Sequence, residues 1–196
     1  LAPLVDNPSL AVSFRANGLS RFFAVSSGSL TLRNLRLAGG KAKDFPGGIP
    51  LSITKPAAAG GSIISAADVT LDRVAISDSV AEAAISARGG AIFMSGGTLT
   101  LNNSIIYFNR TADPAMQVAK DVPFQGGAIT VINGSLKMLF SSVISNRNML
   151  YQTSATPENR GIIDVNLVVP NPKYVLSIDR SIIVNQKASL SPTGDA

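Results

Sequence analysis

The chain lacks cysteine, histidine and tryptophan, and it holds only two Glu among its 196 residues. The absence of cysteine excludes a disulfide framework, a thiolate metal site and a thiol nucleophile. The absence of histidine excludes a Ser-His-Asp triad, an imidazole metal ligand and the usual acid–base group that titrates near neutral pH. No apolar run approaches the roughly 18 residues of a membrane-spanning helix. We therefore expect no metal, no cofactor and no membrane span in this chain, and little catalytic equipment.

The charge pattern also limits the possible partners. The chain has 17 basic and 12 acidic residues, a net charge of +5 and only 6% aromatic residues. A nucleic-acid-binding surface needs clustered cations with stacking aromatic side chains, whereas the basic residues of this chain are spread along it. We therefore expect no nucleic-acid partner. Weak attraction to acidic glycans or anionic surfaces is the simpler consequence of the positive charge.

Self-similarity is the most informative feature of the sequence. Three separate anchors recur at one offset of 37 residues, which indicates duplicated structure. The aligned pairs are Gly89–Ile92 with Gly126–Ile129, Gly97–Leu101 with Gly134–Met138, and Asn109 with Asn146. Gly and Asn tolerate the positive φ that a sharp bend needs. We therefore interpret the following as structural repeat residues: Gly89, Gly90, Gly126, Gly127, Asn109 and Asn146.

Fainter copies flank this pair, with spacings of 39, 30, 37 and 40 residues between equivalent positions. Those positions are Leu30, Val69, Leu99, Leu136 and Leu176. Within a copy the apolar residues alternate at period two, which is typical of strands and not of helices. Short strands in repeats of 30 to 40 residues predict an all-β chain that forms a right-handed parallel β-helix, a solenoid of about five coils with loop insertions.

Stacked coils should place like residues in columns, because like side chains pack well along stacked strands. We predict two inward columns, which are Leu30, Val69, Leu99, Leu136, Leu176 and Leu32, Leu71, Leu101, Met138, Ile178. We predict one outward column, which is Thr31, Thr70, Thr100, Lys137, Ser177.

We expect residues 1–196 to form one domain, with a lead-in over 1–17, coils over 18–186 and a tail over 187–196. Proline-containing insertions are predicted as loops at 41–61, 110–125 and 147–161, where partners commonly bind. The alanine-rich segment 75–88 allows a helical turn.

At its Gly-Gly-Ala-Ile tetrapeptides the chain resembles the polymorphic outer-membrane protein family, which repeats that motif together with Phe-x-x-Asn. The second motif is degraded here: Ile106–Asn109 and Val143–Asn146 keep the Asn and replace the Phe. The opening Gly18–Gly40 also looks like the first coils of pectin-lyase-like β-helix proteins. The resemblance covers about residues 18–186 and implies a β-helical passenger linked to adhesion, secreted or at the cell surface. The motifs build bends rather than sites, so they specify fold better than function.

Enzymes share this fold, so a pair of neighbouring carboxylates would indicate catalysis. Glycoside hydrolysis needs two carboxyl groups about 5 to 9.5 Å apart. Asp72 and Asp179 fall in one column but three coils apart, and Asp68 with Asp72 is the best remaining pair. A lyase needs a base such as Arg and commonly Ca²⁺ held by several acids, and such a cluster is missing.

We therefore expect a non-catalytic scaffold or binding protein that presents loops and one flat face to a protein partner in a larger assembly or to a surface glycan. The alternative is a polysaccharide lyase or hydrolase that acts on acidic glycans. The candidate binding residues are Arg33, Arg36, Lys41, Lys43, Arg73 and Lys137.

Overall fold

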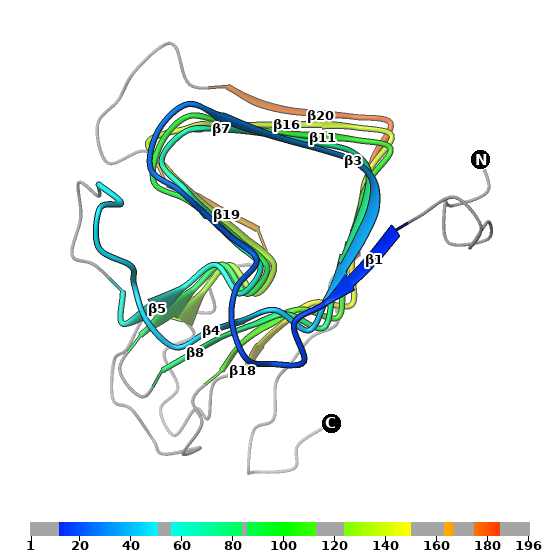
Figure 1. Ribbon diagram of the computed structural model, residues 1–196. Helices are drawn as coiled ribbons and strands as arrows, with labels where there is room; N and C mark the ends of the chain where they lie inside the picture. The colour runs from blue at the N-terminus through cyan, green and yellow to red at the C-terminus, as the bar shows by residue number, and fades with distance from the viewer. Residues whose placement is uncertain are drawn as a thin grey trace, which may run out of the picture.

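The computed structural model describes residues 12–50, 56–83, 86–112, 124–149, 163–166 and 175–184. This part of the chain is all-β and contains no helix, as the sequence predicts. Its strands pair in parallel and form four curled sheets of nine, five, four and three strands. Figure 1 shows the strands of each sheet lying over one another.

The nine-stranded sheet follows the order β20-β16-β11-β7-β12-β17-β21, with β3 pairing β1 and β7. Its strands are β1 (Val12–Arg15), β3 (Ser29–Ala38), β7 (Asp68–Ser77), β11 (Thr98–Asn102), β12 (Ile105–Tyr107), β16 (Ser135–Leu139), β17 (Ser142–Ile144), β20 (Leu176–Asp179) and β21 (Ile182–Val184). The first half of β7 pairs with β11 and its second half with β12. Arg73, between the two halves, has a φ of 54°. The left-handed residue turns the strand, and the sheet bends into two walls there.

The remaining sheets complete the course of the chain. The five-stranded sheet contains β2 (Phe23–Val25), β6 (Ile63–Ser65), β10 (Ile92–Met94), β15 (Ile129–Ile132) and β19 (Ile163–Asn166). The four-stranded sheet contains β4 (Lys41–Ala42), β8 (Val80–Glu82), β13 (Arg110–Ala112) and β18 (Arg147–Met149). The three-stranded sheet contains β5 (Ala58–Ala59), β9 (Ala87–Arg88) and β14 (Phe124–Gln125).

The register of the predicted columns is confirmed. Leu99 pairs with Val69 on one side and with Leu136 on the other, and Leu30 and Leu176 continue the row at its two ends. Val69, Leu99 and Leu136 are fully buried in the main apolar cluster. Each such side chain contributes roughly 1.5–3 kcal/mol through burial of its apolar surface. The outward column is in register as well, by the pairs that join Thr31, Thr70, Thr100, Lys137 and Ser177.

Three expectations are wrong in detail. Leu176 and Ile178, predicted to point inward, are 58% and 45% exposed, because β20 is the last strand on its side of the sheet in the described chain. The segment 75–88 holds no helical turn in its described residues: it ends β7 and contains β8 and β9. Its small side chains allow two sheets to pack closely. An alanine-rich composition by itself fits this role as well as it fits a helix. The predicted loops at 41–61, 110–125 and 147–161 contain strands in their described residues, namely β4, β5, β13, β14 and β18, and their remaining parts lie partly outside the described residues.

The insertion after β4 folds back onto the sheet. Phe45 and Ile49 pack on Ile64 and Phe93, which lie on the outer side of the five-stranded sheet, and the Phe45 and Phe93 rings meet edge to face at 5.7 Å. Arg21 fixes the base of this segment, since its Nη2 donates to the carbonyl oxygen of Asp44 at 2.7 Å and contacts the Asp44 carboxylate at 2.6 Å. The 43–50 segment therefore covers a wall instead of projecting from it.

The second glycines of the pairs Gly60-Gly61 and Gly89-Gly90 lie where the backbone meets the facing four-stranded sheet. A Cβ on Gly90 would overlap the carbonyl oxygen of Gly127 in the next repeat and would come within 2.5 Å of the Arg110 carbonyl oxygen in the facing wall. A Cβ on Gly61 would overlap the Gly90 carbonyl oxygen and lie 2.7 Å from the backbone of Val80. Only glycine fits at these positions, because backbone meets backbone both along the stack and across it.

This contact separates the main interior from a small second cluster made only of alanine. The cluster consists of Ala42, Ala58, Ala81 and Ala87, from β4, β5, β8 and β9. Its methyl groups fill the narrow space between the four-stranded and the three-stranded sheets. The alanine-rich composition of segment 75–88 therefore reflects the small distance between two sheets rather than helix formation.

Candidate functional site

Two ladders of buried polar side chains define the corners of the nine-stranded sheet. Asn146 Oδ1 accepts hydrogen bonds from the backbone N–H of Asn109 at 2.9 Å and from Asn109 Nδ2 at 3.0 Å. Asn109 Oδ1 in turn accepts from the Ser79 backbone N–H at 2.9 Å. Both asparagines are fully buried, so these bonds satisfy backbone groups that water does not reach. The asparagines therefore stabilise the bend and do not face a ligand.

The sequence reasoning missed a second ladder at the other corner. Ser104 Oγ accepts from the Val74 backbone N–H at 3.1 Å, Ser141 Oγ accepts from Ser104 at 3.1 Å, and Ser181 Oγ accepts from Ser141 at 3.1 Å. The spacing of 37 residues between Ser104 and Ser141 matches the repeat and was the available signal. Because serine is common in the chain, a pair of serines at this spacing does not stand out from the sequence.

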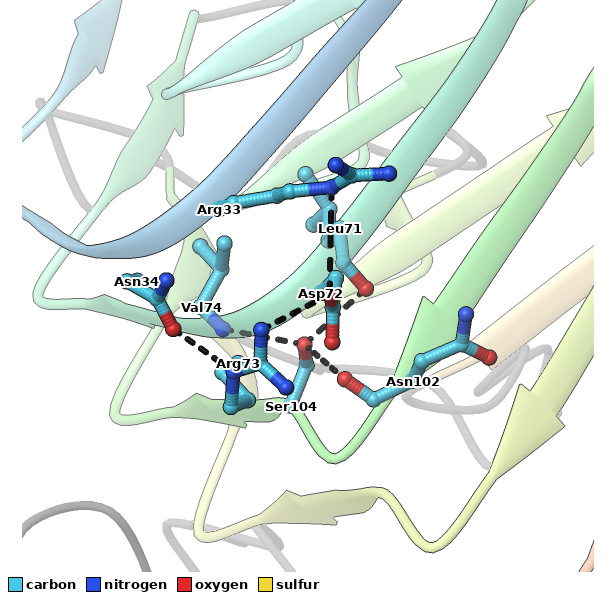
Figure 2. Close-up of polar contacts among 8 residues, drawn as sticks. All are labelled: Arg33, Asn34, Leu71, Asp72, Arg73, Val74, Asn102 and Ser104. Atoms are coloured by element: carbon cyan, nitrogen blue, oxygen red, sulfur yellow. Dashed lines mark hydrogen bonds and ion pairs between the residues drawn. The ribbon is translucent and has the colours of Figure 1, made fainter.

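Two of the six candidate basic residues come together around one carboxylate. Arg33 and Asp72 are paired across β3 and β7, and Arg33 Nε lies 3.8 Å from Asp72 Oδ2. Arg73 Nη2 lies 3.2 Å from the same oxygen, and Arg73 Nε donates to Asn34 Oδ1 at 2.6 Å. Figure 2 shows these side chains gathered at the bend. We call Arg33, Asn34, Asp72 and Arg73 the corner cluster.

The corner cluster carries two positive charges and one negative charge. The side chains of Arg33 and Arg73 are 68% and 45% exposed, and that of Asp72 is 21% exposed. Exposed ion pairs of this kind contribute about 0–1 kcal/mol to stability, so folding alone does not require them. Both guanidinium groups form ion pairs with the Asp72 carboxylate, so Asp72 is a poor candidate for a catalytic base. The net charge suits weak binding of an anionic group.

The other candidate cations lie elsewhere. Arg36 Nη2 donates to the Tyr107 hydroxyl at 2.5 Å, on the second wall of the nine-stranded sheet. Lys41 Nζ lies 3.0 Å from Glu82 Oε2 at the four-stranded sheet. Lys43 is exposed in the segment after β4, and Lys137 is exposed on β16, two strands away from β7 in the sheet. The structure thus does not gather the six residues into one surface.

The carboxylates considered for catalysis do not converge. Asp68 and Asp72 lie four residues apart on β7, so a rise of about 3.3 Å per residue separates them by roughly 13 Å. Asp68 Oδ1 accepts a hydrogen bond from the Thr98 backbone N–H at 2.8 Å. Asp72 and Asp179 do share a column, through Asn102 and Leu139, at about 4.8 Å for each of three steps.

No group of three or more metal-ligating side chains occurs among the residues that the structure describes. Within the same residues, no helix is long and apolar enough to cross a membrane. Comparison of the chain with protein-family models, with curated proteins and with solved structures finds no match.

Proposed function

We propose that the chain is a right-handed parallel β-helix that acts as a non-catalytic scaffold and presents its loops and outer walls to a protein or glycan partner. The parallel pairing of strands one repeat apart supports the architecture. The repeated Gly-Gly-Ala-Ile motif supports a kinship with the polymorphic outer-membrane protein family and with pectin-lyase-like β-helices. A secreted or cell-surface location is part of this proposal.

One observation carries the non-catalytic role: the acidic side chains considered for catalysis, and the one beside Lys41, are already engaged. Asp72 lies between two guanidinium groups, Asp68 binds a backbone N–H, and Glu82 pairs with Lys41. General acid–base catalysis needs a carboxylate that is free to exchange a proton with the substrate. The corner cluster offers charge for binding instead.

The alternative function is cleavage of an acidic polysaccharide, and the pairing of Arg33 and Arg73 about Asp72 is the arrangement that favours it. The deciding experiment incubates the chain with polygalacturonate, alginate and hyaluronan, with and without Ca²⁺. Unsaturated products are followed by ultraviolet absorbance and new chain ends by a reducing-sugar assay. We expect no turnover. Product formation that disappears in Asp72→Asn and persists in Asp68→Asn would establish the enzyme and end our proposal.

The binding role is tested on immobilised glycans and on cell surfaces. Segments 113–123 and 150–162 are replaced by short Gly-Ser turns, which leaves β13, β14, β18 and β19 intact. We expect the circular-dichroism spectrum to stay β-rich while retention on the partner surface falls. Retention unchanged by both replacements would assign binding to the walls and not to these segments.

A further inference from the structure

Phe108 is the unexpected residue in a column of left-handed positions. The strand registers of β3, β7, β12 and β17 place Gly39, Asp78, Phe108 and Ser145 at equivalent corners, all with positive φ. Glycine, Asp and Ser suit such a corner, being small or able to bond locally. A bulky residue there is an outlier, and Phe108 has a φ of 56°.

Packing does not account for this strain, because Phe108 is 56% exposed. Its ring meets the Tyr107 ring at 5.3 Å between centroids with an interplanar angle of 66°. The two rings thus meet nearly edge to face, and the Phe108 ring is exposed at the end of β12. A strained backbone that holds an apolar side chain in solvent points to a function outside folding.

Polar groups of both kinds adjoin this aromatic pair. Arg36 reaches across β7 from β3: its Nη2 donates to the Tyr107 hydroxyl, and its Cζ lies 5.8 Å from the centre of the Tyr107 ring. Asp78 is exposed at the corner equivalent to Phe108 on the neighbouring strand, about 4.8 Å away along the stack. A guanidinium supplies donors and a carboxylate supplies acceptors, beside aromatic faces.

We propose that Phe108, Tyr107, Arg36 and Asp78 form a subsite for a neutral saccharide unit. The aromatic faces pack on the C–H face of a sugar ring, while neighbouring hydroxyl groups accept from Arg36 and donate to Asp78. Ligand sites commonly combine an apolar surface with a few polar groups that fix orientation. The Asp78 carboxylate offsets the charge of Arg36, so this subsite lacks the net positive charge with which the corner cluster would attract an acidic sugar. The inference rests on the proposed binding function and names its ligand class.

The test is isothermal titration of the whole chain with hexasaccharides of glucose, mannose and galactose and with the hexamer of galacturonic acid. We expect at least one neutral hexasaccharide to bind and the uronate to bind at least tenfold more weakly. Phe108→Asn should lower the affinity at least tenfold while the melting temperature holds or rises, because Asn accepts the left-handed backbone. Phe140→Asn is the matched control, since Phe140 occupies the other corner at a φ of 48°.

Each other outcome overturns the subsite. It fails if none of the four hexasaccharides binds, if only the uronate binds, or if Phe108→Asn keeps full affinity. A lower melting temperature in Phe108→Asn with unchanged binding assigns Phe108 to folding. None of these results contradicts the scaffold proposal, which only the polysaccharide-cleavage assay would overturn. The two proposals are therefore tested independently.

Discussion

Asn146 Oδ1 accepts a hydrogen bond from the backbone N–H of Asn109, which lies 37 residues earlier in the chain, at an N···O distance of 2.9 Å. The Asn146 Nδ2 group also donates to the carbonyl oxygens of Ile106 and Ile144. One side chain therefore bonds to two successive repeats at a buried corner, next to the backbone hydrogen bond from the Arg147 N–H to the Asn109 carbonyl oxygen.

Replacement of Asn146 by Ala should lower the free energy of unfolding by about 2–4 kcal/mol, because it leaves several buried backbone groups without partners. Urea denaturation followed by circular dichroism measures the change. Asn102→Ala is the control, since Asn102 lies on the outward side of β11 and should change stability by less than about 0.5 kcal/mol. Equal effects of the two substitutions would contradict the ladder.

Gly90→Ala should prevent folding or cost more than about 4 kcal/mol, because the added Cβ would overlap backbone atoms of Gly127 and Arg110. Soluble yield and the melting temperature report the effect. Gly47→Ala is the matched control, as an added Cβ there meets nothing within 4 Å and should change stability by less than about 1 kcal/mol. A Gly90→Ala protein that melts with the wild type would disprove the contact between walls.

Arg21→Ala should loosen the 43–50 segment, because the Arg21 side chain is only 13% exposed and holds Asp44 through two contacts. We expect faster tryptic cleavage after Lys43, measured by mass spectrometry of timed digests. Arg33→Ala is the control, because its side chain is 68% exposed and contacts a different part of the chain. Identical digestion of both variants would show that Arg21 does not anchor the segment.

Asp72→Asn should strengthen binding of the chain to a sulfated polysaccharide column by releasing two guanidinium groups. The salt concentration at elution should rise further than in Asp68→Asn, which makes the same change in net charge at a separate position of β7. Stability should change by no more than about 1 kcal/mol. Equal elution of the two variants would show that only net charge matters and that the corner cluster has no role of its own.

Much of the strand arrangement could be predicted from the repeat. Equivalent residues at offsets of 30 and 37 predicted the pairing of Leu99 with Val69 and with Leu136, because similar patterns stack in register. The offset of 37 identified Asn109 and Asn146. The corner cluster was predicted only as separate cations. Arg33 reaches Asp72 through the register of β3 with β7, whereas Arg73 reaches the same carboxylate at the bend that follows Asp72 in the chain.

The sequence by itself determined the all-β character, the length of the repeat and the residues that pair between adjacent strands, since these depend on residues that recur along the chain. Only the tertiary structure decided which walls touch, such as Gly90 against Arg110, and which distant side chains meet, such as Arg36 and Tyr107. It also decided that Phe45 covers Phe93. These contacts join residues that share no pattern, because they depend on how sharply the chain turns between successive strands, and packing of the sheets against one another sets that angle.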